Sequence, residues 1–226
     1  MNAPDAIVPS QPPNASGGLP LVVNLAHRQC LFIGGGSVAA RRIPMLLRLG
    51  ASPAIVSPCL HSSLEDMVRS GVVQHSAREF QPGDTAGAFL TIAATNDPLV
   101  NRRVADEVLA RGGLVAVAHS PSLGNCAFMA TTSRGQVTVA IQTGGASPLV
   151  SAALRSRVES VLPESLETKL DLVAAIRAEL KASVESASER GNRWRKAAQL
   201  GLLDRLLFGE DDEAVRDLRR ELGLDG

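Results

Sequence analysis

Three small residues at fixed spacing are the clearest chemical feature of this chain. Gly34, Gly36 and Ala39 fit the pattern G-x-G-x-x-A and directly follow a short apolar run. In a dinucleotide-binding unit, the first glycine lets a strand turn sharply and the second leaves room for a pyrophosphate. The third small residue lets a helix pack close to the strand. Free N–H groups at the helix N-terminus bind phosphates. The spacing therefore predicts a dinucleotide site that includes Ser37 and Val38.

The elements around this motif must position it, and their pattern alternates between strand and helix. Apolar runs predict strands at 29–33, 53–57, 71–75, 88–94 and 114–118. Helical periodicity predicts helices at 37–49, 60–70 and 98–111. This order is typical of a parallel, doubly wound α/β sheet, which binds ligands at the carboxyl ends of its strands. A glycine turn without a ligand is the alternative that this context disfavours.

Three segments should meet at that edge of the sheet, namely 34–38, 57–59 and 95–98. They add four residues to the predicted cofactor site: Pro58, Cys59, Thr95 and Asn96. Asp97 is predicted to cap the next helix, with Pro98 at the first helical position. A catalytic role for Asp97 is the less favoured alternative.

Composition excludes several classes of protein. The 226 residues carry 23 basic and 23 acidic side chains and few aromatic ones, which argues against a nucleic-acid binder. Three cysteines without a CxxC pair predict neither a disulfide framework nor a metal site, and they favour a reducing cytoplasm. We expect no secretory leader, because the first basic residue is Arg28, and no membrane partner, because no apolar run could span a bilayer.

Composition and the pattern of apolar and polar residues change along the chain and predict four regions. Residues 1–18 are rich in proline and predict a disordered tail, and 19–119 predict a Rossmann-like domain. Residues 120–162 form a middle α/β region with an alternating strand at 135–143 and a helix capped by Ser147, with Pro148 first in that helix. Residues 163–226 predict a helical C-terminal domain.

Four motifs in order resemble the precorrin-2 dehydrogenases, a family that includes the dehydrogenase and ferrochelatase module of sirohaem synthase. The motifs are Leu19-Pro20-Leu21-Val22-Val23-Asn24-Leu25, Gly34-Gly35-Gly36-Ser37-Val38-Ala39, Ala93-Ala94-Thr95-Asn96-Asp97 and Thr143-Gly144-Gly145-Ala146-Ser147-Pro148. The resemblance implies NAD-dependent oxidation of precorrin-2 to sirohydrochlorin. It also implies a homodimer in which 120–162 is the dimerisation region and the active site lies between domains. Some members also insert ferrous iron.

One departure from the family bears on the chemistry. Where relatives carry an Asp just after the fifth strand, this chain has His119, which could accept a proton, ligate a metal ion or be merely structural. Thr143, where relatives often have Ser, retains a hydroxyl, and with His119 it is predicted to face the macrocycle. Because metal insertion needs proton acceptors for pyrrole N–H groups, the missing Asp weighs more against chelation. A bifunctional enzyme and a non-catalytic NAD- or tetrapyrrole-binding regulator are the two alternatives.

Other polar residues give weaker predictions. Five arginines could hold substrate carboxylates, although each is more typical of a solvated helix surface: Arg41, Arg42, Arg102, Arg103 and Arg155. His27, His61 and His75 show no ligand spacing and are interpreted as surface or structural residues. The second strand ends without the acid that NAD binders use and without an Arg for a 2′-phosphate, so NAD is predicted from the resemblance.

Overall fold

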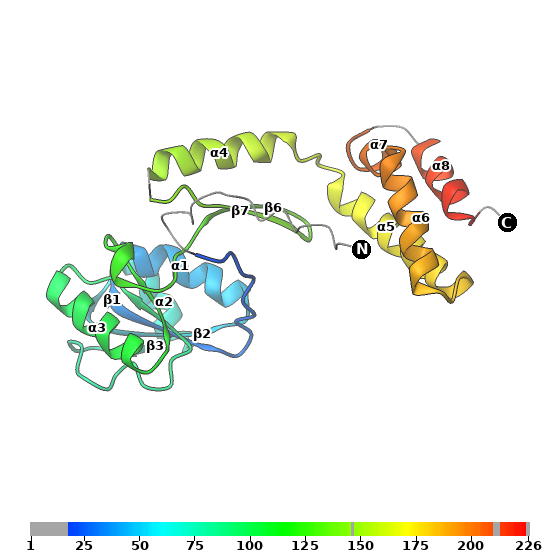
Figure 1. Ribbon diagram of the computed structural model, residues 1–226. Coiled ribbons are helices and arrows are strands. Elements are labelled where there is room, and N and C mark those ends of the chain that lie inside the picture. Colours follow the sequence, from blue (N-terminus) through cyan, green and yellow to red (C-terminus); the bar gives the residue numbers. More distant parts are fainter. Residues whose placement is uncertain (1–17, 146, 210–212, 225–226) are drawn as a thin grey trace, which may run out of the picture. The chain divides into compact units, whose positions relative to one another are not determined.

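The structure, a computed structural model, describes residues 18–145, 147–209 and 213–224 (Figure 1). The chain forms two compact units, one that ends at Phe128 and one that begins at Met129. The predicted tail lies outside the described residues, apart from Gly18. The predicted division into domains at 119 and 162 stays a prediction.

The first unit is built on the predicted parallel sheet. The strand order is β3-β2-β1-β4-β5. The chain adds β2 and β3 on one side of β1 and then crosses to the other side for β4 and β5, as in dinucleotide-binding folds. The strands are β1 (Gln29–Gly35), β2 (Ser52–Leu60), β3 (Gln74–Ser76), β4 (Leu90–Ala93) and β5 (Leu114–Val117). Every neighbouring pair is parallel. The α/β fold class is thus confirmed, with strands close to the predicted positions.

Helices cover both faces of this sheet, which explains why its central strands β1, β4 and β5 are largely apolar and buried. The helices are α1 (Ser37–Arg48), α2 (Ser62–Arg69) and α3 (Pro98–Ala110). Alternate residues of β1 point to opposite faces, with Phe32 packed among α1 and α2 and Ile33 among residues of α3. A short 3₁₀ helix, η1 (Pro121–Leu123), follows β5. The sheet is doubly wound, as predicted.

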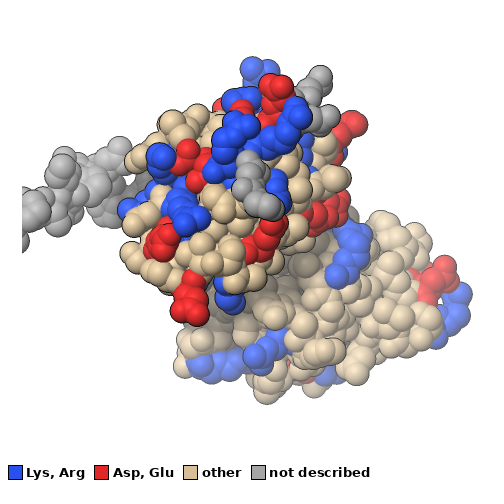
Figure 2. Space-filling view, turned by 90° about the vertical axis from the view of Figure 1, so that its right-hand side faces the viewer, with Lys and Arg blue, Asp and Glu red and all other residues tan. Residues whose placement is uncertain are grey.

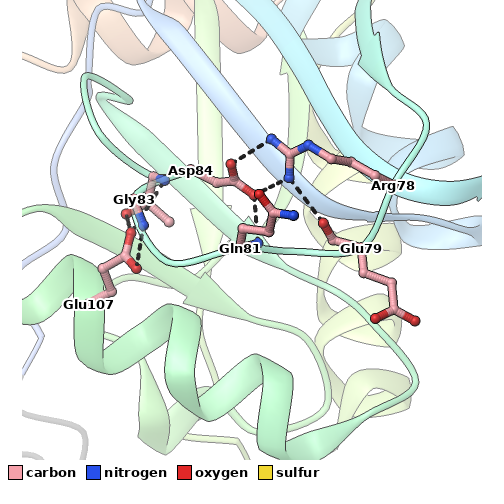
Figure 3. Close-up of polar contacts among 7 residues, drawn as sticks. Arg78, Glu79, Gln81, Gly83, Asp84 and Glu107 are labelled. Carbon is pink, nitrogen blue, oxygen red and sulfur yellow. Dashed lines mark hydrogen bonds and ion pairs between the residues drawn. The ribbon is translucent and has the colours of Figure 1, made fainter.

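The connection from β3 to β4 contains no helix and is fixed by charged hydrogen bonds instead (Figure 3). Arg78 binds both carboxylate oxygens of Asp84 at 2.7 Å, and the N–H of Gln81 donates to the same carboxylate at 2.8 Å. On α3, Glu107 accepts hydrogen bonds from the Gly83 N–H at 3.0 Å and from the buried Thr85 hydroxyl. Side chains thus replace the crossover helix in holding this loop.

In this loop, hydrogen bonds outweigh desolvation in setting the pKa values of the Asp84 and Glu107 carboxyl groups. Arg78 holds the pKa of Asp84 below its usual value. Burial raises the pKa of Glu107, but the bonds from Thr85 and Gly83 outweigh it, and the net pKa is lowered. Both carboxylates are therefore ionised at neutral pH and favour the folded chain.

The second unit begins with a hairpin and continues as helices. The antiparallel strands β6 (Ala130–Arg134) and β7 (Val137–Ile141) are joined at Gly135, and α4 (Pro148–Val161) contacts both. The sequence predicted only the second strand. Ser147 caps α4 at its N-terminus and Pro148 is the first residue of that helix, as predicted.

Four further helices form the predicted helical part of the chain. They are α5 (Leu166–Ser183), α6 (Ala187–Gln199), α7 (Leu202–Phe208) and α8 (Glu213–Leu222). Their shared core contains Ile176, Leu180, Leu206 and Leu218. Figure 2 shows basic and acidic side chains intermixed on the face that it presents. Among these helices, ion pairs such as Arg219–Glu179 at 2.8 Å join charges of opposite sign. No helix in the described part of the chain is long and apolar enough to cross a membrane.

Candidate dinucleotide site

The glycine turn has the geometry that phosphate binding requires. Gly34 has φ +110°, and a Cβ there would lie 2.5 Å from the backbone oxygen of Ala94, so only glycine fits. A Cβ on Gly36 would meet nothing within 4 Å. Gly36 caps α1 without a side-chain hydrogen bond, and the first turn has no acidic residue. Ala39 is fully buried against the sheet. The N–H groups of Ser37 and Val38 at this terminus suit an anion.

Gly35 is a site residue that the sequence pattern did not identify. The register between β1 and β2 shifts between Ile33 and Gly35, and Gly35 pairs with Leu60. A Cβ on Gly35 would lie 2.6 Å from the carbonyl oxygen of Cys59. The three-glycine run itself was the available indication, because the middle glycine fits no role in G-x-G-x-x-A. The absence of a side chain at Gly35 lets β1 and β2 approach each other closely beside the phosphate turn.

The predicted loop 57–59 is an irregular part of β2 rather than a loop. The Ser57 hydroxyl donates to the carbonyl of Cys59 at 2.7 Å, and the imidazole Nε2 of His75 donates to the carbonyl of Ser57 at 2.9 Å. Pro58 and Cys59 are exposed at this bulge, which lies against Gly35. His61 accepts a hydrogen bond from the N–H of Ser63 at the start of α2. The structural interpretation of these two histidines agrees with their contacts.

The segment after β4 has the cap that the sequence predicted. The Asp97 carboxylate accepts hydrogen bonds from the N–H groups of Leu99 at 2.8 Å and Val100 at 3.4 Å, and Pro98 is the first residue of α3. Behind it, the buried Asn101 forms three hydrogen bonds to Thr95. The sequence analysis did not single out Asn101. These contacts fix the shape of the segment 95–98.

A pocket of about 200 Å³ lies where the segments after β4 and β5 meet. It is lined by Thr95, Asn96, Pro98, Asn101, Ala118, His119, Ser120 and Leu123. Three of the predicted site residues, Thr95, Asn96 and His119, are thus brought together. His119 has a backbone φ of +62°, which few residues other than glycine adopt, and its side chain is exposed. The pocket lies at the carboxyl ends of β4 and β5, where doubly wound sheets bind their ligands.

The larger pocket, of about 480 Å³, lies elsewhere. It is lined by His27, Gln29 and Ser52 at the amino ends of strands, together with Gln74 and their neighbours. None of the predicted site residues lines it. Since ligands of doubly wound sheets bind at the carboxyl ends, we place the candidate site at the smaller pocket.

Thr143 belongs to the second unit, in the segment between β7 and α4. Its hydroxyl lies 2.8 Å from that of Ser151. Its predicted role beside His119 stays a prediction. Among the described residues, no three His, Cys, Asp or Glu side chains gather as a metal ion would require.

The predicted arginines have different surroundings. Arg42 lies 4.3 Å from the ring centre of Phe128, and burial, then the charge of Arg41, lowers its pKa. Arg155 forms an ion pair with Glu159 at 3.1 Å. Arg41, Arg102 and Arg103 are exposed, the first on α1 and the others on α3. Of the four arginines predicted in the first unit, these three are the exposed ones.

Comparison with known proteins identifies the kind of fold. Residues 21–130 match a family described as "Putative NAD(P)-binding". A solved structure of SirC, a precorrin-2 dehydrogenase, matches 91% of this chain and 99% of its own, with a TM-score of 0.71 and 25% identity. The siroheme synthases of Azotobacter vinelandii (34% identity) and Methylobacillus flagellatus (32%) each match 90% of this chain. The chain spans 44% of the length of these two relatives. The resemblance to the precorrin-2 dehydrogenase family and to part of siroheme synthase is thus confirmed.

Proposed function

We propose that this chain oxidises precorrin-2 to sirohydrochlorin with NAD as the hydride acceptor. The observation that carries the proposal is the match over 91% of the chain to a precorrin-2 dehydrogenase. The glycine turn supports it independently, because Gly36 leaves open space at a helix N-terminus that has no capping side chain. An enzyme that transfers a hydride to NAD needs such an open helix N-terminus to bind the pyrophosphate of the cofactor.

The residues of the first unit fit NAD. The N–H groups of Ser37 and Val38 would bind the pyrophosphate, and Pro58 and Cys59 would border the adenosine. Thr95 and Asn96 would border the nicotinamide ring, which accepts a hydride from the substrate when bound. The end of β2 has neither the acid of NAD binders nor an Arg for a 2′-phosphate, so NAD rather than NADP is proposed from the resemblance to the precorrin-2 dehydrogenases.

His119 is the proposed proton acceptor. Oxidation removes a proton as well as a hydride, and a neutral imidazole can accept a proton near pH 7. His119 is exposed, lines the pocket and follows β5, at the position where the family resemblance implies an Asp. Thr143 would offer its hydroxyl to the macrocycle. The carboxylates of precorrin-2 would contact exposed arginines such as Arg41.

A homodimer is part of this proposal. A two-stranded sheet such as β6 with β7 is marginally stable alone, and α4 contains no buried residue. Leu149 on α4 is 81% exposed and Leu154 is 46% exposed. A second copy is the proposed cover for these apolar side chains, as light scattering at micromolar concentration would show. The cysteine content supports the proposed cytoplasmic location.

One incubation separates the proposed function from its alternatives. Pure protein is mixed with precorrin-2 and NAD, and absorbance follows sirohydrochlorin and NADH together. Formation of both supports the dehydrogenase, and absence of both with retained ligand binding indicates a regulator. Ferrous iron added to sirohydrochlorin then tests chelation. Rapid sirohaem formation above the rate without protein would establish the bifunctional enzyme.

A further inference from the structure

The oxygen and the nitrogen of the Asn101 side-chain amide both form hydrogen bonds to one neighbour, Thr95. It is 6% exposed in the first turn of α3 and lines the pocket. Its Oδ1 accepts hydrogen bonds from the N–H of Thr95 at 3.0 Å and from the Thr95 hydroxyl at 2.8 Å. Its Nδ2 donates to the Thr95 carbonyl at 3.0 Å. All three polar groups of Thr95 are therefore bound by Asn101.

These bonds replace the sheet ladder at the point where it ends. β4 stops at Ala93, and the last bonds at this end join the N–H of Ala118 to the Ala93 carbonyl and the N–H of Ala94 to the Ile33 carbonyl. The Thr95 backbone lies beyond that pairing. Because a buried peptide group without a partner costs free energy, Asn101 determines which conformation this segment can adopt.

The same contacts limit what Thr95 itself can do. Its hydroxyl has one proton, directed to Asn101 at 2.8 Å or to the carbonyl of Asp97 at 3.0 Å. Its oxygen accepts a hydrogen bond from the N–H of Asp97 at 3.2 Å. The hydroxyl proton is thus already used within the chain. Thr95 contributes the position of its segment to a ligand, rather than a donated hydrogen bond.

We infer that Asn101 is a positioning residue for the dinucleotide, because it holds Thr95 and Asn96 as the wall of the pocket beside His119. This inference rests on the proposed function. It adds that affinity for NAD depends on an amide that acts through Thr95. The inference therefore predicts a specific dependence on the Nδ2 donor.

Asn101→Asp tests that donor, because the two side chains have the same shape. An ionised carboxylate presents an oxygen to the Thr95 carbonyl, and the two acceptors repel each other. A protonated carboxyl has an O–H in place of Nδ2–H and restores the bond. Burial and the facing Thr95 carbonyl disfavour the ionised form and raise the pKa of the new carboxyl above its usual value of about 4. We therefore expect the dissociation constant for NAD to rise about tenfold over wild type at pH 8 and to return to within about threefold of it at pH 5. Calorimetry at both pH values, each against wild type, measures this recovery.

A matched control is provided by Asn125, whose amide also bridges two backbone groups. It accepts a hydrogen bond from the N–H of Val115 at 2.9 Å and donates to the carbonyl of Gly113 at 2.8 Å, at the opposite end of β5 from His119. Asn125→Asp should leave NAD affinity within about twofold of wild type at both pH values. A kinetic comparison adds that Asn101→Asp should raise the KM for NAD and leave the KM for precorrin-2 unchanged.

The outcomes distinguish this inference from the proposed function. Unchanged NAD affinity in a folded Asn101→Asp variant at pH 8 overturns the inference alone, and so does a loss that persists at pH 5. Absence of NAD binding by the wild type refutes the proposed function and the inference with it. If Asn101→Asp does not fold, Asn101→Ala decides, because it removes the Nδ2 donor without adding a charge. Weaker NAD binding by a folded Asn101→Ala variant supports the inference, and wild-type affinity overturns it.

Discussion

Gly36→Asp should separate dinucleotide binding from folding. The backbone of Gly36 is extended, with φ −83°, and a Cβ there meets no atom within 4 Å. The substitution is therefore compatible with the fold. Aspartate is also among the best N-cap residues, a few tenths of a kcal/mol better than glycine. The free energy of unfolding should stay within about 0.5 kcal/mol of wild type.

Binding should be lost for two reasons that act together. The new carboxylate would accept hydrogen bonds from the N–H groups that the pyrophosphate needs. It would also place a negative charge about 4 Å from a phosphate, which costs about 4 kcal/mol at an effective dielectric constant near 20. Since about 1.4 kcal/mol is a factor of ten, we expect the affinity for NADH to fall by about a thousandfold.

Calorimetry with NADH and urea denaturation measure the two quantities on the same samples. Gly34→Ala is the contrasting variant, because its Cβ would lie 2.5 Å from a backbone oxygen at φ +110°. It should lose about 2 kcal/mol or more of stability. A folded Gly36→Asp protein that binds NADH with wild-type affinity would refute the assignment of the phosphate site.

Two further predictions concern the proton acceptor and the charged loop. His119→Asn should slow sirohydrochlorin formation by about 10²-fold with little change in NAD affinity, since asparagine tolerates the left-handed backbone but cannot accept the proton. His119→Asp should retain activity, and near-full activity of His119→Asn would make His119 structural. Asp84→Asn should lower the free energy of unfolding by about 1–2 kcal/mol at pH 7, because the Arg78 partner is 41% exposed and partly screened. Because the pKa of Asp84 is lowered in the folded chain, this stabilisation begins to decrease as the pH falls through the usual carboxyl pKa of about 4 and is lost below the lowered pKa. The gap between wild type and variant in urea titrations should therefore narrow steadily as the pH is lowered from 7 through about 4 and below, and a gap independent of pH would contradict the ion pair.

Periodicity predicted the first unit well because its central strands are buried on both faces. Phe32 and Ile33 enter different cores, so β1 had to be apolar throughout, and that pattern is visible in the sequence. β6 was missed because Ala130–Arg134 is mostly polar and only its middle residue is buried. The ladder with β7 defines that strand, and backbone pairing leaves little trace in side-chain type.

The limits of the site prediction follow from the same distinction. Gly36 and His119 could be placed at this edge of the sheet from the sequence because a residue at the end of a parallel strand has a predictable place, whatever its partners are. Asn101 looks like any polar residue on the surface of a helix, yet it is buried because α3 faces Thr95 at that turn. Gly35 occupies a free position of the pattern and is required only because β2 bulges toward it. Strand ends are specified by chain order, whereas these two residues depend on how neighbouring segments pack. A residue that acts through its neighbours therefore becomes visible only when the three-dimensional contacts are known.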